Sequence, residues 1–239
     1  MRKRERLWGF LRRRLSPTEY LGLHLTMGLL ICLAGVALFA WIAGELRDQD
    51  QLVAVDERIA ESLHEHALRH PGWVAFFRGL TTLGNLQVLA GVTLLVALVL
   101  LVARKRLLAV VWLVAQVAGG LLNAELKSLY ERPRPAFVDS FVQESSYAFP
   151  SGHSMGAMLV YGFLAYLLYR VLPRPWQRWL IVMAFGLLVL AIGFSRMYLG
   201  AHWLSDVCAG FLAGASWLAV CISAIEVVRR RRLGRHADV

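Results

Sequence analysis

The sequence predicts an all-α integral membrane protein with six transmembrane helices. Three observations lead to this fold class: 58% of the 239 residues are hydrophobic, the mean hydropathy is +0.54, and the apolar residues form long runs. A membrane-spanning helix needs about 20 mostly apolar residues. The segments that qualify are, in chain order, 21–44, 86–103, 107–126, 154–172, 176–194 and 207–228.

The first two segments differ in how they begin. Leu21–Gly44 follows a basic stretch, as a cleaved signal peptide would, but its apolar run exceeds the signal core of about 7–15 residues. A retained span is therefore favoured. Leu86–Ala103 contains only Gln87 and Thr93 as polar residues, and Trp73–Leu83 is a candidate outward extension of this span.

The four later segments are also predicted to be helices within the membrane. Leu107–Leu126 gains polar residues towards its end, and Ser154–Leu172 is apolar and aromatic with Arg170 near its end. Trp176–Phe194 and Val207–Val228 complete the set. The three cysteines lie in or beside these spans without metal-like spacing, so they are predicted to be small buried hydrophobes.

The charged residues are divided unevenly between the two sides of the predicted bundle. The side with both termini and the loops near 105 and 174 holds 18 of the 26 Lys and Arg residues but 4 of the 16 acidic residues. The positive-inside rule places this side in the cytoplasm. We therefore expect a basic cytoplasmic N-terminus at 1–20, a six-span domain at 21–228 and a basic cytoplasmic tail at 229–239. Because every basic tract adjoins an apolar span, contact with anionic lipid explains these tracts better than nucleic-acid binding.

Ionisable residues gather near span ends on the opposite, non-cytoplasmic side. Placing an ionisable side chain within the membrane costs free energy unless the group is paired or hydrated, so these residues are functional candidates. They are Lys127, Arg132, Arg134, His153, Arg196, His202 and Asp206.

The spacing of His202 and Asp206 indicates a nucleophile and its orienting group. If the last helix begins near Ala201, these residues, four apart, share one helix face. The carboxylate then accepts from one imidazole nitrogen and leaves the other facing a pocket. An ordinary ion pair at a helix start is the competing interpretation.

The remaining polar residues suit a phosphate group. Lys127 and Arg134 combine a point charge with a bidentate fork. Ser151 and Gly152 let backbone N–H groups approach an oxyanion closely. His153, just beyond them, is predicted to start a helix, and an imidazole can give or take a proton near neutral pH.

The sequence offers little for a metal ion or another cofactor. Asp206 with Asp139 is the one weak candidate for a metal pair. We therefore expect metal-independent phosphoryl transfer without a cofactor, in which cations stabilise the transferring group and an imidazole attacks phosphorus.

Three ordered motifs connect these residues to a known family. They read "KSLYERPRP" from Lys127 to Pro135, "PSGH" from Pro150 to His153, and "SRMYLGAHWLSD" from Ser195 to Asp206. The chain resembles the type 2 phosphatidic acid phosphatase (PAP2) superfamily, whose signatures are K-x6-RP, PSGH and SR-x5-H-x3-D. The resemblance implies a helical core of the kind shared with vanadium haloperoxidases.

The resemblance also implies a role for each motif residue. His202 becomes the nucleophile that forms a phosphohistidine, Asp206 orients it, and His153 is the general acid. Arg132 lies outside the motif, and its role stays open. The implied phosphate-binding residues are Lys127, Arg134, Ser151, Gly152 and Arg196.

The expected protein is a lipid phosphatase of the bacterial inner membrane with its site on the non-cytoplasmic face. Its expected partners are the bilayer and a lipid phosphate: undecaprenyl pyrophosphate, phosphatidylglycerophosphate, phosphatidic acid or lipid A phosphate. A lipid-to-lipid phosphotransferase using the same site is the main alternative. A haloperoxidase and a non-enzymatic lipid-binding protein are weaker ones. The linker Glu45–Gly72 is expected to be either a helix over the site or a solvated helix.

Overall fold

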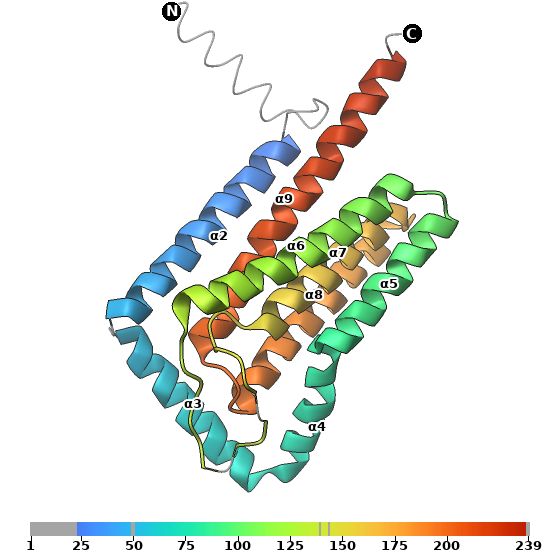
Figure 1. Cartoon of the computed structure of the whole chain (residues 1–239). Helices are drawn as coiled ribbons and strands as arrows, with labels where there is room; N and C mark the ends of the chain where they lie inside the picture. Colours follow the sequence, from blue (N-terminus) through green and yellow to red (C-terminus); the bar gives the residue numbers. More distant parts are fainter. Residues whose placement is uncertain (1–22, 49–50, 139, 143, 238–239) are drawn as a thin grey trace, which may run out of the picture.

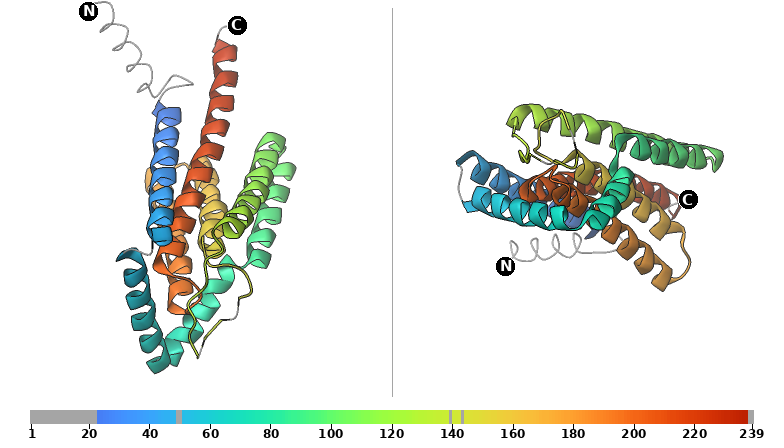
Figure 2. Two further views of the ribbon diagram at one scale, coloured as in Figure 1. Left: turned by 60° about the vertical axis from the view of Figure 1, so that its left-hand side comes forward. Right: turned by 90° about the horizontal axis from the view of Figure 1, so that it is seen from below.

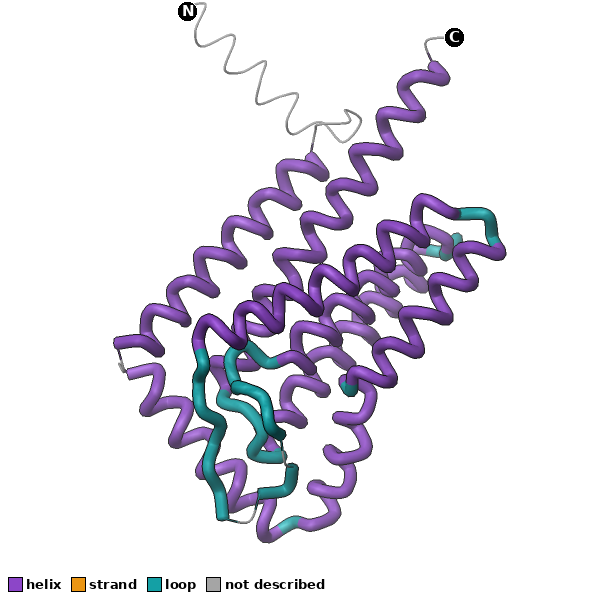
Figure 3. Tube along the Cα trace, viewed as in Figure 1, coloured by secondary structure: helices purple, strands orange, loops and turns teal. Residues whose placement is uncertain are grey.

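The computed structural model describes residues 23–48, 51–138, 140–142 and 144–237, and every regular element within these ranges is helical (Figures 1 and 3). The predicted N-terminus at 1–20 lies outside them. The elements are α2 Leu23–Asp48, α3 Gln51–Arg69, α4 Pro71–Thr81, the 3-10 helix η1 Thr82–Gly84, α5 Leu86–Val102, α6 Arg106–Tyr130, α7 Gly152–Val171, α8 Pro175–Tyr198 and α9 Leu204–Ala237.

The six predicted spans coincide with α2 and α5 to α9. Among the described helices, five are long and apolar enough to cross a membrane, and a bent pair supplies a sixth. That pair joins Pro71–Gly84 to Leu86–Val102 with a bend of 44°. The apolar extension predicted at Trp73–Leu83 is therefore present, but it turns away from the axis of α5. The fold class is confirmed.

The helix α7 is the centre of the bundle. It packs against α5, α6, α8 and α9, while α2 lies along α9 (Figures 1 and 2). Trp112, Phe163 and Ile192 are fully buried in the core around α7. Many large apolar side chains of α2, α5, α6 and α8 are exposed on the outside, as expected of a surface that faces lipid.

Close packing of α2 on α9 depends on small residues. A side chain at Gly28 would collide with Ser223, and one at Gly35 would collide with Ser216. In a bilayer, helices gain little from hydrophobic burial against each other, so the close approach that small residues allow is the main source of attraction.

One end of the bundle holds the helices α3 and α4, and it is called the polar end because the ionisable residues of the three motifs lie there. There α3, α4 and the loop between α6 and α7 surround the first turns of α7 and α9 (Figures 1 and 3). The turn that contains Arg104 and Lys105, and the turn before Pro175, lie at the opposite end (Figure 1). The helix α9 runs past the predicted span end at Val228 as far as Ala237.

Candidate active site

The three sequence motifs meet at the polar end of the bundle because each lies at a helix terminus. Lys127 is in the last turn of α6, and Arg196 is in the last turn of α8. The PSGH segment forms the start of α7, and Asp206 lies in the first turn of α9. Backbone N–H groups without intrahelical partners therefore accompany the charged side chains.

The pair His202 and Asp206 is formed, although α9 begins later than expected. The helix starts at Leu204, not near Ala201, so His202 precedes it. His202 Nδ1 nevertheless lies 3.3 Å from Asp206 Oδ2, and the same oxygen accepts from the Trp203 backbone N–H at 2.9 Å. Asp206 thus caps its own helix and orients the imidazole, and both side chains are almost completely buried.

Arg134 determines which imidazole nitrogen of His202 is free of a proton. Its Nη1 lies 3.1 Å from His202 Nε2. Because a guanidinium can only donate, Nε2 must accept, which leaves the proton on Nδ1 facing Asp206. Burial, followed by the charges of Arg134, Arg196 and Lys127, holds the pKa of His202 well below its ordinary value of 6.5. The ring is therefore neutral, with the lone pair of Nε2 directed into the cationic group.

The guanidinium of Arg134 is otherwise held by the loop and by the segment before α9. Nε donates to the Ser146 carbonyl at 2.7 Å, and Nη1 donates to the Ala201 carbonyl at 2.7 Å. Nη2 reaches the Ser146 hydroxyl at 3.1 Å and the Tyr147 carbonyl at 3.3 Å. The ammonium of Lys127 donates to the same Tyr147 carbonyl.

The third cation, Arg196, meets a carboxylate. Its Nη2 lies 2.5 Å from Glu144 Oε1, and its Nη1 donates to Thr81 Oγ1 at 3.1 Å. Arg196 is 1% exposed, and its Nε has no hydrogen-bond partner within the described part of the chain. One donor of this guanidinium is therefore still available for a further acceptor.

The start of α7 offers a smaller set of backbone donors than the sequence suggested. The Ser151 backbone N–H donates to the Asp206 carbonyl at 3.0 Å, and its hydroxyl accepts from the Ser154 N–H at 3.4 Å. The first-turn N–H groups of Gly152 and His153 remain as candidates for an oxyanion. A Cβ at Gly152 would lie 3.0 Å from Asn123 Oδ1, so a side chain here would press on the Asn123 amide.

His153 is held by a residue from the bend between η1 and α5. Its Nε2 lies 2.9 Å from Asn85 Oδ1, an arrangement in which the ring N–H donates to the amide oxygen. A side chain at Gly84 would collide with the imidazole, so the bend itself shapes this part of the site.

Comparison with known proteins identifies the family. Residues 107–230 match the model of the PAP2 superfamily, and this region holds all three motifs. The chain belongs to the PAP2 superfamily. It is a multi-pass membrane protein and a PAP2-type lipid phosphatase.

Three matches illustrate how far the likeness extends. Phosphatidylglycerophosphatase B of Bacillus subtilis (strain 168) is 35% identical over 148 residues, which cover 62% of this chain and 72% of that protein. The crystal structure of a transmembrane PAP2 type phosphatidylglycerolphosphate phosphatase from Bacillus subtilis matches with a TM-score of 0.75 and 30% identity, and covers 82% of this chain and 96% of that one. Aquifex aeolicus LpxE shares the fold, with a TM-score of 0.54, 24% identity, and coverage of 72% of this chain and 94% of that one.

Four residues that contact the ionisable side chains of the motif regions lie outside the motifs, and none of them is predicted to have a site role from the sequence. Thr81 and Asn85 precede the matched region 107–230, and Glu144 lies in the loop before PSGH. Asp56 of α3 is fully buried beside Arg132. A signal for Asp56 exists in the sequence, because it occupies the apolar face of α3 four residues after Leu52.

The described part of the chain contains no cluster of three or more His, Cys, Asp or Glu side chains suited to a metal ion. Asp139, the weak partner considered for Asp206, lies outside the described residues. Asp206 contacts Arg132, His202 and the Trp203 backbone N–H, and of these groups His202 alone belongs to a residue type that binds metals.

Proposed function

We propose that this PAP2 phosphatase hydrolyses the phosphate of a membrane lipid headgroup through a phosphohistidine on His202, with phosphatidylglycerophosphate as the first substrate to test. The observation that carries the proposal is the neutral, oriented imidazole of His202, whose Nε2 faces Arg134 with Lys127 and Arg196 close by. The choice of first substrate rests on the Bacillus subtilis relative, a phosphatidylglycerophosphatase B.

The first chemical step forms a P–N bond and breaks a P–O bond. The Nε2 lone pair of His202 attacks phosphorus, Arg134 moves from Nε2 to the phosphate oxygens, and His153 gives a proton to the leaving alcohol oxygen. Asp206 accepts the Nδ1 hydrogen bond and stabilises the positive charge that the ring acquires. Lys127, Arg196 and the N–H groups of Gly152 and His153 stabilise the equatorial oxygens.

The second step returns the enzyme to its starting state. Water attacks the phosphohistidine, His153 accepts the proton from this water, and the P–N bond breaks to release inorganic phosphate. His153 thus serves as acid and then as base, as reversibility of the pathway requires.

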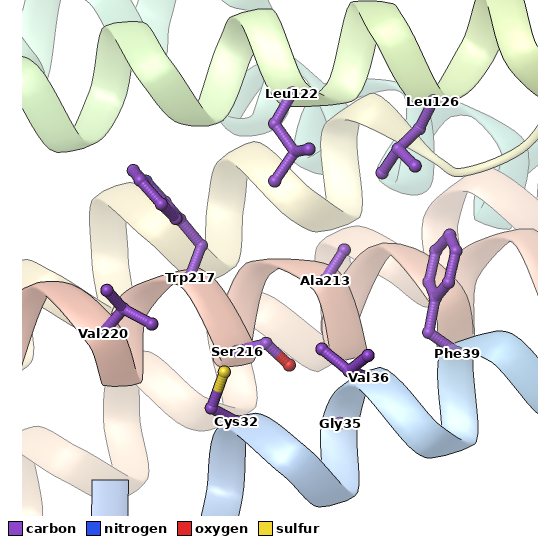
Figure 4. A pocket seen from close by; sticks show the side chains of 10 residues that line it. All are labelled: Cys32, Gly35, Val36, Phe39, Leu122, Leu126, Ala213, Ser216, Trp217 and Val220. Carbon is purple, nitrogen blue, oxygen red and sulfur yellow. The ribbon is translucent and has the colours of Figure 1, made fainter. Parts of the chain in front are cut away.

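A lateral groove supports a lipid as substrate. A hollow of about 280 Å³ opens between α2, α6 and α9 and is lined almost entirely by apolar side chains (Figure 4). Leu126 in this groove precedes Lys127, and the Phe39 ring packs 5.3 Å from the Phe149 ring, two residues before Ser151. A hydrocarbon tail in the groove would leave its headgroup phosphate beside the cations.

Charge supports a site on the non-cytoplasmic face of a bacterial inner membrane. The turn between α5 and α6, which contains Arg104 and Lys105, lies at the end of the bundle opposite the start of α9 (Figure 1). If this basic end is cytoplasmic, the site opens on the other side.

The test is phosphate release by the purified protein in detergent micelles with a chelator present. The panel is phosphatidylglycerophosphate, undecaprenyl pyrophosphate, phosphatidic acid and lipid A, with His202→Ala as the matched variant. We expect release from phosphatidylglycerophosphate that resists the chelator and falls by at least about 10³-fold in the variant. Residual release near the wild-type rate would exclude His202 as nucleophile. Transfer of label to a second lipid in place of water would identify a phosphotransferase.

A further inference from the structure

A buried chain of side chains connects α3 to the proposed nucleophile. Arg132 Nη1 donates to Asp206 Oδ1 at 2.6 Å, and Arg132 Nη2 donates to Asp56 Oδ2 at 2.8 Å. The order is therefore Asp56, Arg132, Asp206 and His202. Arg132 is the arginine that the PAP2 motif leaves unassigned.

The same residues hold the first turn of α9. Asp56 Oδ1 accepts from the Ser205 backbone N–H at 2.9 Å, and the Ser205 hydroxyl donates to Asp56 Oδ2. Asp206 accepts from the Trp203 N–H. Two of the N–H groups at this helix start are thus capped, one by its own helix and one by α3. These hydrogen bonds fix the position of the backbone that carries the side chains of Asp206 and His202.

The two buried carboxylates of this chain, Asp56 and Asp206, share the positive charge of Arg132. Asp56 and Asp206 are both 0% exposed, and Arg132 is the cation placed between them. Two buried carboxylates repel each other unless a cation lies between them, and the guanidinium can bond to both at once. Its plane also lies over the Trp203 ring, 5.4 Å from the centroid, which limits its movement.

We propose that Asp56 and Arg132 are positioning residues of the phosphatase reaction, and that α3 is therefore part of the catalytic apparatus. They fix the carboxylate of Asp206, and through it the ring of His202, without touching the substrate. This inference rests on the proposed function, because it assigns the residues to the phosphohistidine step.

The first test is Asp56→Asn, which keeps the shape of the side chain and removes its charge. We expect kcat to fall on the order of 10- to 100-fold, as small misplacements of reacting groups do. KM should stay within about twofold, because Asp56 does not contact the phosphate. Glu57→Gln is the matched control, since it neutralises an exposed carboxylate one residue away on the same helix.

The second test asks whether Asp56 and Arg132 both act on His202 through Asp206. Arg132→Gln should lower kcat more than Arg132→Lys, which keeps the charge but cannot reach both carboxylates. Adding Asp56→Asn to Arg132→Gln should reduce kcat by much less than the product of the single effects. Single-turnover formation of the phosphohistidine should slow by the same factors as kcat.

The outcomes separate this inference from the proposed function. Wild-type kcat in Asp56→Asn, or losses that multiply in the double variant, would overturn the positioning role and leave His202 as nucleophile. If a fall in melting temperature accounts for the lost activity, the contacts of α3 only stabilise the fold, and the positioning role is overturned. Absence of turnover in the wild-type protein on every lipid would overturn both.

Discussion

The two sides of the PAP2 site are built differently. On the α9 side, His202, Asp206 and Asp56 are buried, and side chains contact side chains from three separate elements. On the loop side, Arg134 and Lys127 are held by backbone carbonyls of residues 146 and 147, in an exposed segment. The proposed nucleophile is therefore oriented without a substrate, whereas the proposed phosphate-binding cations would have to exchange their partners for phosphate oxygens.

Glu144 makes this contrast sharper. Its side chain is 28% exposed, and its carboxylate forms an ion pair with Arg196, as a bound anion would. On the proposed phosphate-binding side, the cations thus contact protein acceptors that a substrate would have to displace. Substitutions of residues on the α9 side should lower kcat, and substitutions of residues on the loop side should also alter KM.

Loss of the orienting carboxylate should have the largest effect. Asp206→Asn removes the charge that supports the imidazole and that pairs with Arg132. We expect kcat to fall by about 10³-fold or more, with KM little changed, because a wrongly held tautomer cannot attack. Steady-state kinetics with the melting temperature as control will measure this. A loss of less than tenfold would contradict the role of Asp206.

Loss of Arg134, a proposed phosphate-binding residue, should affect both kinetic constants. Arg134→Ala should raise KM and lower kcat, for a combined loss in kcat/KM of about 10²-fold, because the phosphate is charged in the ground state and in the transition state. Arg78→Ala is the matched control, since Arg78 also donates to a carbonyl of this loop, that of Phe141, at 3.2 Å. Equal losses in the two variants would indicate a general effect on the loop.

Removal of the competing carboxylate should improve binding. Glu144→Gln eliminates the charge that occupies Arg196, so KM should fall by about two- to fivefold while kcat stays near the wild-type value. Competitive inhibition by orthovanadate should strengthen by a similar factor. Glu65→Gln, on the exposed face of α3, should change neither quantity. An unchanged or raised KM would show that Glu144 does not compete with phosphate.

The smallest effect should be that of mild acid on the wild-type enzyme. The pKa of His202 lies well below 6.5, so the neutral ring persists as pH falls from about 7.5 to 6 and kcat/KM should not decline through this group. Arg134→Ala removes one of the charges that lower this pKa, so the acid limb should move to higher pH in that variant. Profiles of kcat/KM against pH for the two proteins will measure the shift.

Much of this molecule could be predicted from local patterns. Apolar runs of span length predict the helices α2 and α5 to α9, because a bilayer requires long, internally hydrogen-bonded segments. Ordered motifs predict which of the charged residues come together, because each motif lies next to the end of a predicted span. The helix α9 begins at Leu204 and not near Ala201, because Asp206 and Asp56 accept from backbone N–H groups at its start.

The sequence by itself determined the membrane class, the family and the charged residues at the helix ends, since these follow from composition, spacing and short motifs. Only the tertiary structure decided the partners of those residues. Asp56 reaches Ser205 across 149 positions, and Asn85 reaches His153 across 68. Such contacts depend on how α3 and the bend before α5 fold back over the bundle. That arrangement arises from packing and from the need to pair buried charges, which a periodic pattern does not encode.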